Sequence, residues 1–315
     1  MDTGWLTAKF DSMHLSKVLA IALGLFAGLS FLGAKEPKVF KWINPLTEKE
    51  LQAAPGLSHQ TFKSEAVGEE VGYCVFLTEG YEAAQNRERR YPVIYMLHGG
   101  RPGDESKFAN RLPFIYDAIT SGRLEPTIVV LNNGGPISHY NVPGRADCRG
   151  KDLLVDELIP LVDRNYRTIA SREGRALQGY SQGGRATARI GFGHPELFSQ
   201  LVIGSAGAAP EKRIQQSGGT EREGLVFAKG DDMWTYTKTY AKRYKKKYPL
   251  DIFVHVGDEA DYNYEGNLEY DAFLTELGLE HEFTVVPGQK HGNKAYDRLQ
   301  QEIIEFQRAS FARGL

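Results

Sequence analysis

Short, mainly apolar runs recur along this chain, and residues that favour turns follow most of them. A continuous apolar run is typical of a strand that is buried on both faces, as in a parallel sheet. Two earlier runs, 61–64 and 70–77, flank a Gly68-Glu69 turn and predict an antiparallel pair. The later runs cover residues 91–97, 127–131, 201–203, 252–256 and 283–286.

Between these runs, apolar residues return at the spacing of an amphipathic helix. Strands that alternate with helices predict right-handed crossovers and a mainly parallel sheet. No linker interrupts the alternation after residue 57, so we expect residues 57–315 to form one α/β domain. The predicted helices cover residues 105–121, 151–164 with a late break at Pro160, 233–248, 268–277 and 296–311.

The N-terminal segment, residues 1–34, has the pattern of a targeting sequence. Lys17 precedes an apolar stretch, 18–29, and the small residues Gly33 and Ala34 follow it. A cationic residue, a short apolar core and small residues favour a secretory signal peptide over a spanning helix. An uncleaved membrane anchor is the alternative, and contact with a membrane is expected only in that case.

The start of the chain and the stretch behind the apolar segment need separate interpretations. Asp2 and Asp11 precede Met13, which is unusual for a signal peptide, so the true start is Met1 or Met13. Residues 35–56 are polar and proline-spaced, which predicts a linker with little regular structure. A signal of this kind predicts a secreted or periplasmic protein.

Composition excludes several function classes. The 315 residues include 38 Lys and Arg and 40 Asp and Glu, so the net charge of −2 gives no support to nucleic acid as a partner. The chain lacks a P-loop, an H-E-x-x-H motif and a G-x-G-x-x-G that opens a helix, so we expect no cofactor and no metal. Cys74 and Cys148 are interpreted as buried thiols, with a disulfide as the alternative in an exported protein.

The stretch Gly179-Tyr180-Ser181-Gln182-Gly183 has the pattern G-x-S-x-G. A short apolar pair precedes it and a potential helix follows, which is the strand–turn–helix context of a nucleophile elbow. Glycines on both sides of the serine avoid Cβ clashes in such a strained turn. The pattern therefore predicts Ser181 as a nucleophile, and a serine that only caps a helix is the alternative.

A serine nucleophile needs a base, usually a histidine that a carboxylate orients. In an α/β-hydrolase layout the order along the chain is serine, acid, histidine. His291 lies just past the last predicted strand, at the sheet edge where ligands bind, and is the predicted base. His255 lies inside a buried strand and is interpreted as a core residue, whereas His281 lies in a charged turn and is expected to be solvated.

The acid is expected on the loop that follows the strand at 252–256. Three carboxylates compete there, namely Asp258, Glu259 and Asp261. Asp261 is the first choice because it lies furthest from the strand and has the longest reach across the sheet edge. Asp258 is the second choice and Glu259 the third.

Two backbone N–H groups are expected to stabilise an oxyanion. The first is that of Gln182, at the start of the helix that follows the serine. The second belongs to Gly100 or Arg101, since glycines after a strand let the backbone approach a ligand closely. His98 is interpreted as a structural hydrogen-bonding residue.

From about Gly56 to its C-terminus the chain resembles the esterase branch of the α/β-hydrolase superfamily. That branch holds feruloyl esterases, acetylxylan esterases, enterochelin-esterase-like proteins, S-formylglutathione hydrolases and mycolyltransferases. The family usually has its acid three positions after the loop glycine, where this chain has Ala260, and one extra residue would place Asp261 there. The matching stretches are residues 91–100, 157–160, 166–168, 179–184, 257–267 and 287–288 with His291.

The resemblance implies an α/β-hydrolase fold, with a mostly parallel central sheet of about eight strands flanked by helices. It also implies Ser181 as nucleophile, His291 as base and an aspartate of the Gly257 loop as acid. The expected function is that of an exported serine esterase acting through an acyl-enzyme on feruloyl or acetyl esters of polysaccharide. The alternatives are a siderophore (enterochelin-type) esterase, an acyltransferase, and a non-catalytic binding module on the same fold.

Overall fold

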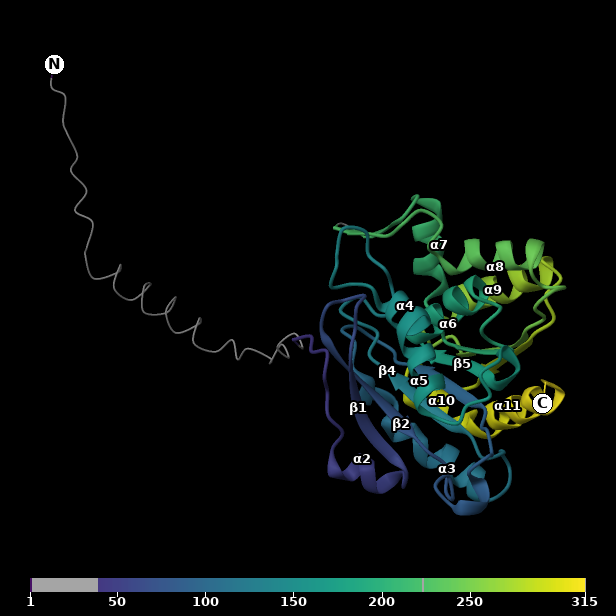
Figure 1. Cartoon of the computed structure of the whole chain (residues 1–315). Helices are drawn as coiled ribbons and strands as arrows, with labels where there is room; N and C mark the ends of the chain where they lie inside the picture. The colour runs from purple at the N-terminus through teal and green to yellow at the C-terminus, as the bar shows by residue number, and fades with distance from the viewer. Residues whose placement is uncertain (2–38, 223, 315) are drawn as a thin grey trace. The chain divides into compact units, whose positions relative to one another are not determined.

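A central sheet of eight strands, in the order β1-β2-β4-β3-β5-β6-β9-β10, organises the folded part of the chain (Figure 1). Pairing is antiparallel between β1 and β2 and between β2 and β4, and parallel at all the other junctions. This confirms the predicted α/β-hydrolase architecture. The strands are β1 (Leu57–Lys63), β2 (Glu70–Phe76), β3 (Val93–Leu97), β4 (Ile128–Asn132), β5 (Arg175–Tyr180), β6 (Gln200–Gly204), β9 (Asp251–Gly257) and β10 (Glu282–Val286).

This computed structural model describes Met1 and residues 39–222 and 224–314. Apart from Met1, the predicted targeting segment 1–34 and the alternative start at Met13 lie outside the described residues. The unit that contains the sheet runs from Val39 to Leu315. None of the described helices is long and apolar enough to span a membrane.

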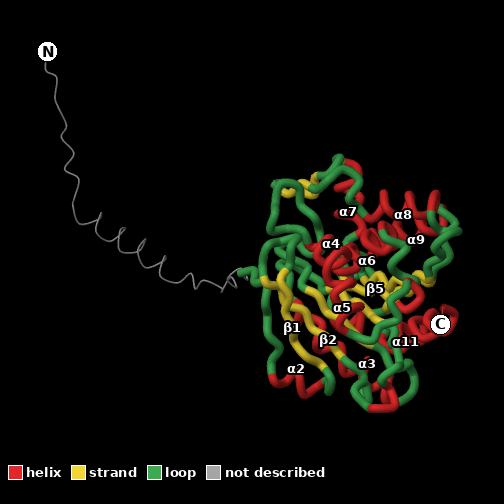
Figure 2. Tube along the Cα trace, viewed as in Figure 1, coloured by secondary structure: helices red, strands yellow, loops and turns green. Residues whose placement is uncertain are grey.

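Helices cover both faces of the sheet, as the red and yellow segments of Figure 2 show. The α-helices are α2 (Glu48–Ala53), α3 (Leu112–Thr120), α4 (Gly150–Asp152), α5 (Ile159–Asn165), α6 (Gln182–Gly193), α7 (Ala208–Gln216), α8 (Met233–Arg243), α9 (Tyr264–Glu276), α10 (Asn293–Arg298) and α11 (Gln300–Gly314). The other helical segments are the 3₁₀-helices η1 (Ala84–Asn86), η2 (Glu105–Arg111) and η4 (Arg172–Gly174) and the π-helix η3 (Leu153–Leu158).

Alternate residues of the strands pack into two separate apolar clusters. In β3, Val93, Tyr95 and Leu97 join one cluster, while Ile94 and Met96 join the other. Helices η3, α5, α6, α8 and α9 supply the first cluster, and η2, α3, α10 and α11 supply the second. Burial on both faces explains why these strands are almost continuously apolar in the sequence.

Several elements differ from the predicted ones. The helix expected over 151–164 breaks beside Pro160 as predicted, since Pro160 has no N–H to donate within the first turn of α5, but the part before the break is further divided into α4 and the π-helix η3. The predicted linker 35–56 contains α2, which a capping box between Thr47 and Glu50 stabilises. Helix α7 and the hairpin of β7 (Thr220–Arg222) and β8 (Leu225–Val226) were not predicted.

Candidate active site

Ser181 lies at the sharp turn between β5 and α6. Its dihedrals, φ 60° and ψ −115°, are strained for a residue with a side chain. A Cβ at Gly183 would overlap the carbonyl oxygen of Leu97 at the end of β3, and one at Gly184 would lie 2.5 Å from the carbonyl oxygen of Gly204 at the end of β6. The glycines after the serine therefore let α6 begin directly against the two neighbouring strands.

Ser181 and His291 are in hydrogen-bond contact, although they come from distant parts of the chain. Nε2 of His291 lies 2.9 Å from Oγ of Ser181. Its other ring nitrogen, Nδ1, lies 3.1 Å from Oδ1 and 3.3 Å from Oδ2 of Asp261. The structure thus brings together the predicted nucleophile, the predicted base and the first-choice acid in one hydrogen-bonded path.

Asp261 has a buried side chain, and donors surround it. The N–H of Asn263 donates to Oδ1 at 2.9 Å, and the Ser205 hydroxyl donates to Oδ2 at 2.7 Å. Burial by itself raises the pKa of Asp261, but hydrogen bonds from His291, Ser205 and the Asn263 N–H outweigh it. The pKa of Asp261 therefore lies below its usual value, and the carboxyl group is ionised at neutral pH.

The other two carboxylates of this loop do not contact His291. Asp258 accepts hydrogen bonds from the backbone N–H groups of Gly288 and Ala260, so its carboxylate joins two loops. Glu259 is exposed. The sequence offered three neighbouring carboxylates as the acid. In the structure, Asp261 is the one of these three whose side chain points to His291.

The remaining candidate histidines lie outside the hydrogen-bonded path. His255 is fully buried in β9, neither ring nitrogen has a hydrogen-bond partner, and burial lowers its pKa to about 4. His281 is 7% exposed and pairs with Asp271 at 2.8 Å, so the expectation that it is solvated was wrong. The ring of His281 is covered because it lies against α9, which sequence spacing does not reveal.

The loop after β3 passes beside the nucleophile. A Cβ at Gly99 would lie only 3.3 Å from the Cβ of Ser181, and Gly100 has a positive φ of 71°. Lys107 Nζ donates to the Gly99 carbonyl at 3.3 Å, and His98 Nδ1 lies 3.2 Å from the same oxygen. Because C=O and N–H point in opposite directions within a peptide, these contacts turn the N–H of Gly100 away from Lys107.

Gln182 and Arg101 complete the set of predicted oxyanion donors. Gln182 is the first residue of α6, so its N–H has no partner within the helix and lies at the positive end of the helix dipole. Arg101 follows Gly100, and its guanidinium donates to Glu221 on β7 at 2.9 Å. The side chain of Glu221, which no sequence motif identified, thereby helps to hold the loop that carries Gly100 and Arg101.

Two tyrosines flank the ring of His291. Tyr180 stacks on it with a centroid distance of 5.1 Å, and its hydroxyl accepts a hydrogen bond of 2.9 Å from the N–H of Gly292. Tyr262 lies 4.2 Å from the same ring by centroid and is 77% exposed. Both tyrosines neighbour predicted site residues in the sequence, but only the folded chain shows that they contact the histidine.

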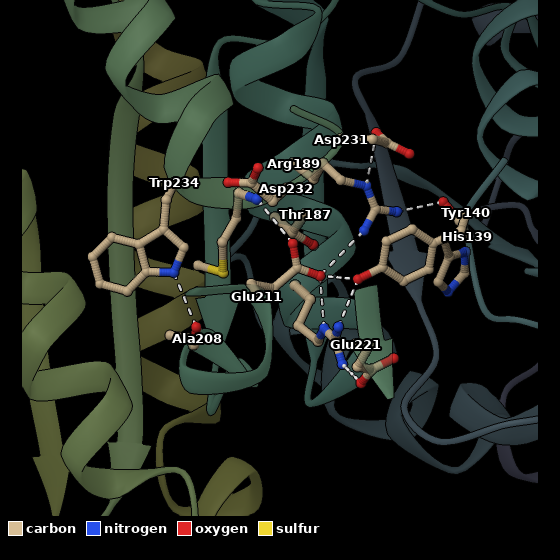
Figure 3. A network of polar contacts seen from close by, with 12 residues as sticks. His139, Tyr140, Thr187, Arg189, Ala208, Glu211, Glu221, Asp231, Asp232 and Trp234 are labelled. Carbon is tan, nitrogen blue, oxygen red and sulfur yellow. Dashed lines mark hydrogen bonds and ion pairs between the residues drawn. The ribbon is translucent and has the colours of Figure 1, made fainter. Parts of the chain in front are cut away.

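A buried network of charged groups links helix α6, which follows Ser181, to the segment that includes α7 and β7. Figure 3 shows Glu211 near its centre, close to Arg189, Tyr140 and Glu221. Arg185 of α6 donates to Glu211 at 2.7 Å and to Glu221 at 3.0 Å. Because Glu221 also pairs with Arg101, the network connects the helix behind Ser181 with the loop of the expected oxyanion donors.

Glu211 itself is fully buried and receives several donors. Burial raises the pKa of Glu211 well above its usual value. Arg185 Nε, the Tyr140 hydroxyl and the N–H of Met233 all donate to its two oxygens. Since each of these groups needs an acceptor, the hydrogen-bond pattern fits the ionised carboxylate.

Among the residues that the structure describes, no group of three or more His, Cys, Asp or Glu is arranged to hold a metal ion.

Comparison with known proteins assigns the class of this protein. The family model described as "Putative esterase" matches residues 64–307, and the chain belongs to this family. Its members are carboxylic ester hydrolases, which agrees with the fold and with the serine, histidine and aspartate brought together at the sheet edge.

Individual relatives carry the same esterase descriptions. An endo-1,4-beta-xylanase/feruloyl esterase of Xylanibacter ruminicola is 32% identical over 165 residues, which are 49% of this chain and 22% of that protein. A solved ferulic acid esterase has a TM-score of 0.66 at 21% identity and covers 81% of this chain and 98% of its own.

A second solved structure, a ferulic acid esterase from the anaerobic fungus Anaeromyces mucronatus, has a TM-score of 0.63 at 19% identity. The match covers 89% of this chain and 96% of that chain. At these identities the structural likeness shows the fold alone.

Proposed function

We propose that this chain is a serine esterase that works through an acyl-enzyme. The observation that carries the proposal is the hydrogen-bonded path from Ser181 Oγ through both ring nitrogens of His291 to the buried carboxylate of Asp261. A hydroxyl is a weak nucleophile, and this path supplies the base that takes its proton and the charge that stabilises the resulting imidazolium.

Acylation follows from the geometry. Ser181 Oγ attacks the ester carbonyl carbon while Nε2 of His291 takes the hydroxyl proton. The C–O bond to the leaving alcohol then breaks, and the imidazolium donates the same proton to that oxygen. Water, deprotonated by His291, attacks the acyl-enzyme and releases the acid and the free serine.

The oxyanion of each tetrahedral intermediate is assigned to two backbone N–H groups. One belongs to Gln182 at the N-terminus of α6. The other belongs to Gly100 or Arg101 on the loop beside Ser181. Donors of this kind act where negative charge develops, and removing one typically costs about 100-fold to 1,000-fold in kcat.

The substrate class we propose is a feruloyl or acetyl ester on polysaccharide. The names of the relatives support it, and a ferulic acid esterase from Anaeromyces mucronatus was solved in complex with ferulic acid. The exposed ring of Tyr262 beside His291 supports an aromatic acyl group at the mouth of this site.

We further propose export, with residues 1–34 as a signal peptide, 35–56 as a linker and 57–315 as the esterase domain. A polysaccharide ester lies outside the cell, which agrees with the apolar segment that follows Lys17. N-terminal sequencing of the mature protein tests this proposal. A first residue near position 35 supports cleavage, whereas an intact chain in the membrane fraction contradicts it.

The enzyme proposal is tested with kcat/KM on p-nitrophenyl acetate, methyl ferulate, acetylated xylan and a catecholate siderophore. Ser181→Ala is expected to lower turnover to less than about a thousandth of wild type on every ester. Ser199→Ala is the matched control, because its hydroxyl donates to the backbone carbonyls of Glu173 and Arg175, at the end of β5 opposite to Ser181.

The preferred substrate decides between the proposed function and its alternatives. Preference for ferulate or acetylxylan supports the proposed substrate, and preference for the catecholate ester supports a siderophore esterase instead. Transfer of the acyl group to an added sugar would indicate an acyltransferase. Turnover that does not depend on Ser181 contradicts the serine mechanism, and no turnover on any ester leaves a binding module.

A further inference from the structure

A second serine contacts both the acid and the base of the site. Ser205, the residue directly after β6, lies with its Oγ 2.7 Å from Oδ2 of Asp261 and 2.8 Å from Nδ1 of His291. The residue is fully buried. Its hydroxyl is therefore shielded from bulk water and shared among these two partners and the neighbouring Tyr180 hydroxyl.

The donor and acceptor capacities of these groups determine where the proton of Ser205 lies. An ionised carboxylate only accepts hydrogen bonds, so the single hydroxyl proton of Ser205 must point to Asp261. Oγ then faces His291 with its lone pairs, and this contact is favourable only when Nδ1 carries a proton. A proton on Nδ1 leaves Nε2 unprotonated, which is the state in which His291 accepts the proton of Ser181.

We propose that Ser205 is a positioning residue that holds His291 in the Nδ1–H tautomer; the inference rests on the esterase function proposed above. Ser205 acts together with Asp261, since both accept from the same Nδ1–H group while Ser205 donates to the carboxylate. When His291 becomes an imidazolium during acylation, the Nδ1–H is already shared between two oxygens, so no group has to rotate.

The backbone around Ser205 holds the hydroxyl in this position. Ser205 has a positive φ of 38°, a strained value that persists where the surroundings compensate for it. Its N–H donates to the carbonyl of His255 at 2.6 Å, and its own carbonyl accepts from Asn263 Nδ2 at 2.8 Å. Asn263 also donates its N–H to Asp261, so one residue orients the acid and Ser205 together.

The position of Ser205 follows from the sheet order. Strand β6 lies between β5, which leads into Ser181, and β9, which leads into the loop of Asp261. The first residue after β6 therefore reaches the space between nucleophile and acid. A serine hydroxyl suits this place because it donates and accepts at once, which neither an alanine nor a glycine does.

The test uses two variants of the full chain, Ser205→Ala and Ser205→Gly. The glycine variant is included because glycine adopts a positive φ without strain. Both variants lack the hydroxyl. A hydrogen bond to a charged group is lost in each, so kcat/KM is expected to fall about 10-fold to 100-fold, with the loss in kcat and KM little changed. Ser310→Ala is the matched control, because Ser310 donates its hydroxyl to Asp251 at the far end of β9 and is expected to keep wild-type kinetics.

A spectroscopic readout separates this inference from the esterase proposal. The ¹⁵N chemical shifts of His291 report which ring nitrogen carries the proton, with no need for turnover. We expect the Nδ1–H tautomer to dominate in the wild type and the Nε2–H tautomer to gain population in both Ser205 variants. If the wild type shows no Ser181-dependent turnover in the ester panel, the proposed esterase function is contradicted, but the tautomer measurement remains valid.

Two results would overturn the inference. One is an unchanged tautomer in the variants together with kcat/KM within about twofold of wild type. The other is an equal loss of activity in Ser310→Ala, since the effect would then come from removing any buried serine hydroxyl. Thermal unfolding of each variant shows whether it is folded, and Ser205→Gly keeps the test open if Ser205→Ala is not.

Discussion

Replacing Asp261 by Asn tests which carboxylate of the Gly257 loop serves as the acid. Oδ1 of Asp261 accepts from His291 and from the N–H of Asn263, and Oδ2 accepts from Ser205 and from the N–H of Gly257 at 3.3 Å. An asparagine offers one oxygen and one amide nitrogen. Whichever way the amide lies, its NH₂ faces two donors, and no negative charge remains to stabilise the imidazolium.

The loss of activity is expected to be large because Asp261 sets the tautomer of His291 and stabilises its imidazolium form. We expect Asp261→Asn to lower kcat/KM about 1,000-fold to 10,000-fold, as the loss of such an aspartate does in serine hydrolases. That corresponds to about 4 to 5 kcal/mol of transition-state stabilisation. KM is expected to change little, because Asp261 is buried and does not form the surface that receives the ester.

Asp258→Asn is the matched control, three residues earlier in the same loop. Its two carboxylate oxygens each accept from one backbone N–H group, and an asparagine oxygen keeps one of these contacts. Because Asp258 does not contact His291, kcat/KM is expected to stay within about threefold of wild type. The assay is p-nitrophenyl acetate hydrolysis with both variants, and thermal unfolding checks that both are folded. An Asp258→Asn loss equal to that of Asp261→Asn, or Asp261→Asn activity above about a tenth of wild type, would refute the assignment.

Four further predictions follow from the packing and the charges. Gly183→Ala forces a Cβ into the end of β3 and is expected to cost about 1–3 kcal/mol in urea unfolding and to lower kcat/KM. Glu211→Ala removes the buried carboxylate that Arg185 and Arg189 share and is expected to cost about 3–5 kcal/mol in the same assay. Cys74 and Cys148 are free and buried, and burial raises the pKa of both thiols, so a thiol reagent is expected to label them only after denaturation. The pKa of Asp261 is lower in the folded state than in the unfolded state, so the ionised carboxylate stabilises the fold above the unfolded-state pKa. This stabilisation is lost as the pH falls through the folded-state pKa. Urea unfolding of the wild type and of Asp261→Asn between neutral and acidic pH measures the loss.

Much of the fold was predictable because its signals are local. A strand buried on both faces must be apolar along its length, so β3, β4 and β9 were visible as runs of residues. The turn at Ser181 must have glycines beside it, because α6 begins against two other strands. The break at Pro160 was predictable for the same reason, because a missing N–H acts within one turn, whereas helix α2 was missed although its capping box is local too.

The site was predictable only in part, for a physical reason. The G-x-S-x-G motif identified Ser181, and chain order with the strand end identified His291. The structure brings the two into contact although 110 positions separate them. Loop position alone left Asp261 and Asp258 open, because the direction of a side chain depends on the packing around it. The surroundings of His281 were mispredicted for the same reason, since α9 covers it.

The sequence by itself therefore determined the strands, the elbow and the residue types of the chemistry. The tertiary structure alone decided which carboxylate meets His291, that Ser205 joins them, and that Glu221 links Arg185 to Arg101. These contacts join residues from separate elements, and their partners are chosen by the order of strands in the sheet. Periodicity and motif report what each segment needs locally, whereas the sheet order decides which segments become neighbours.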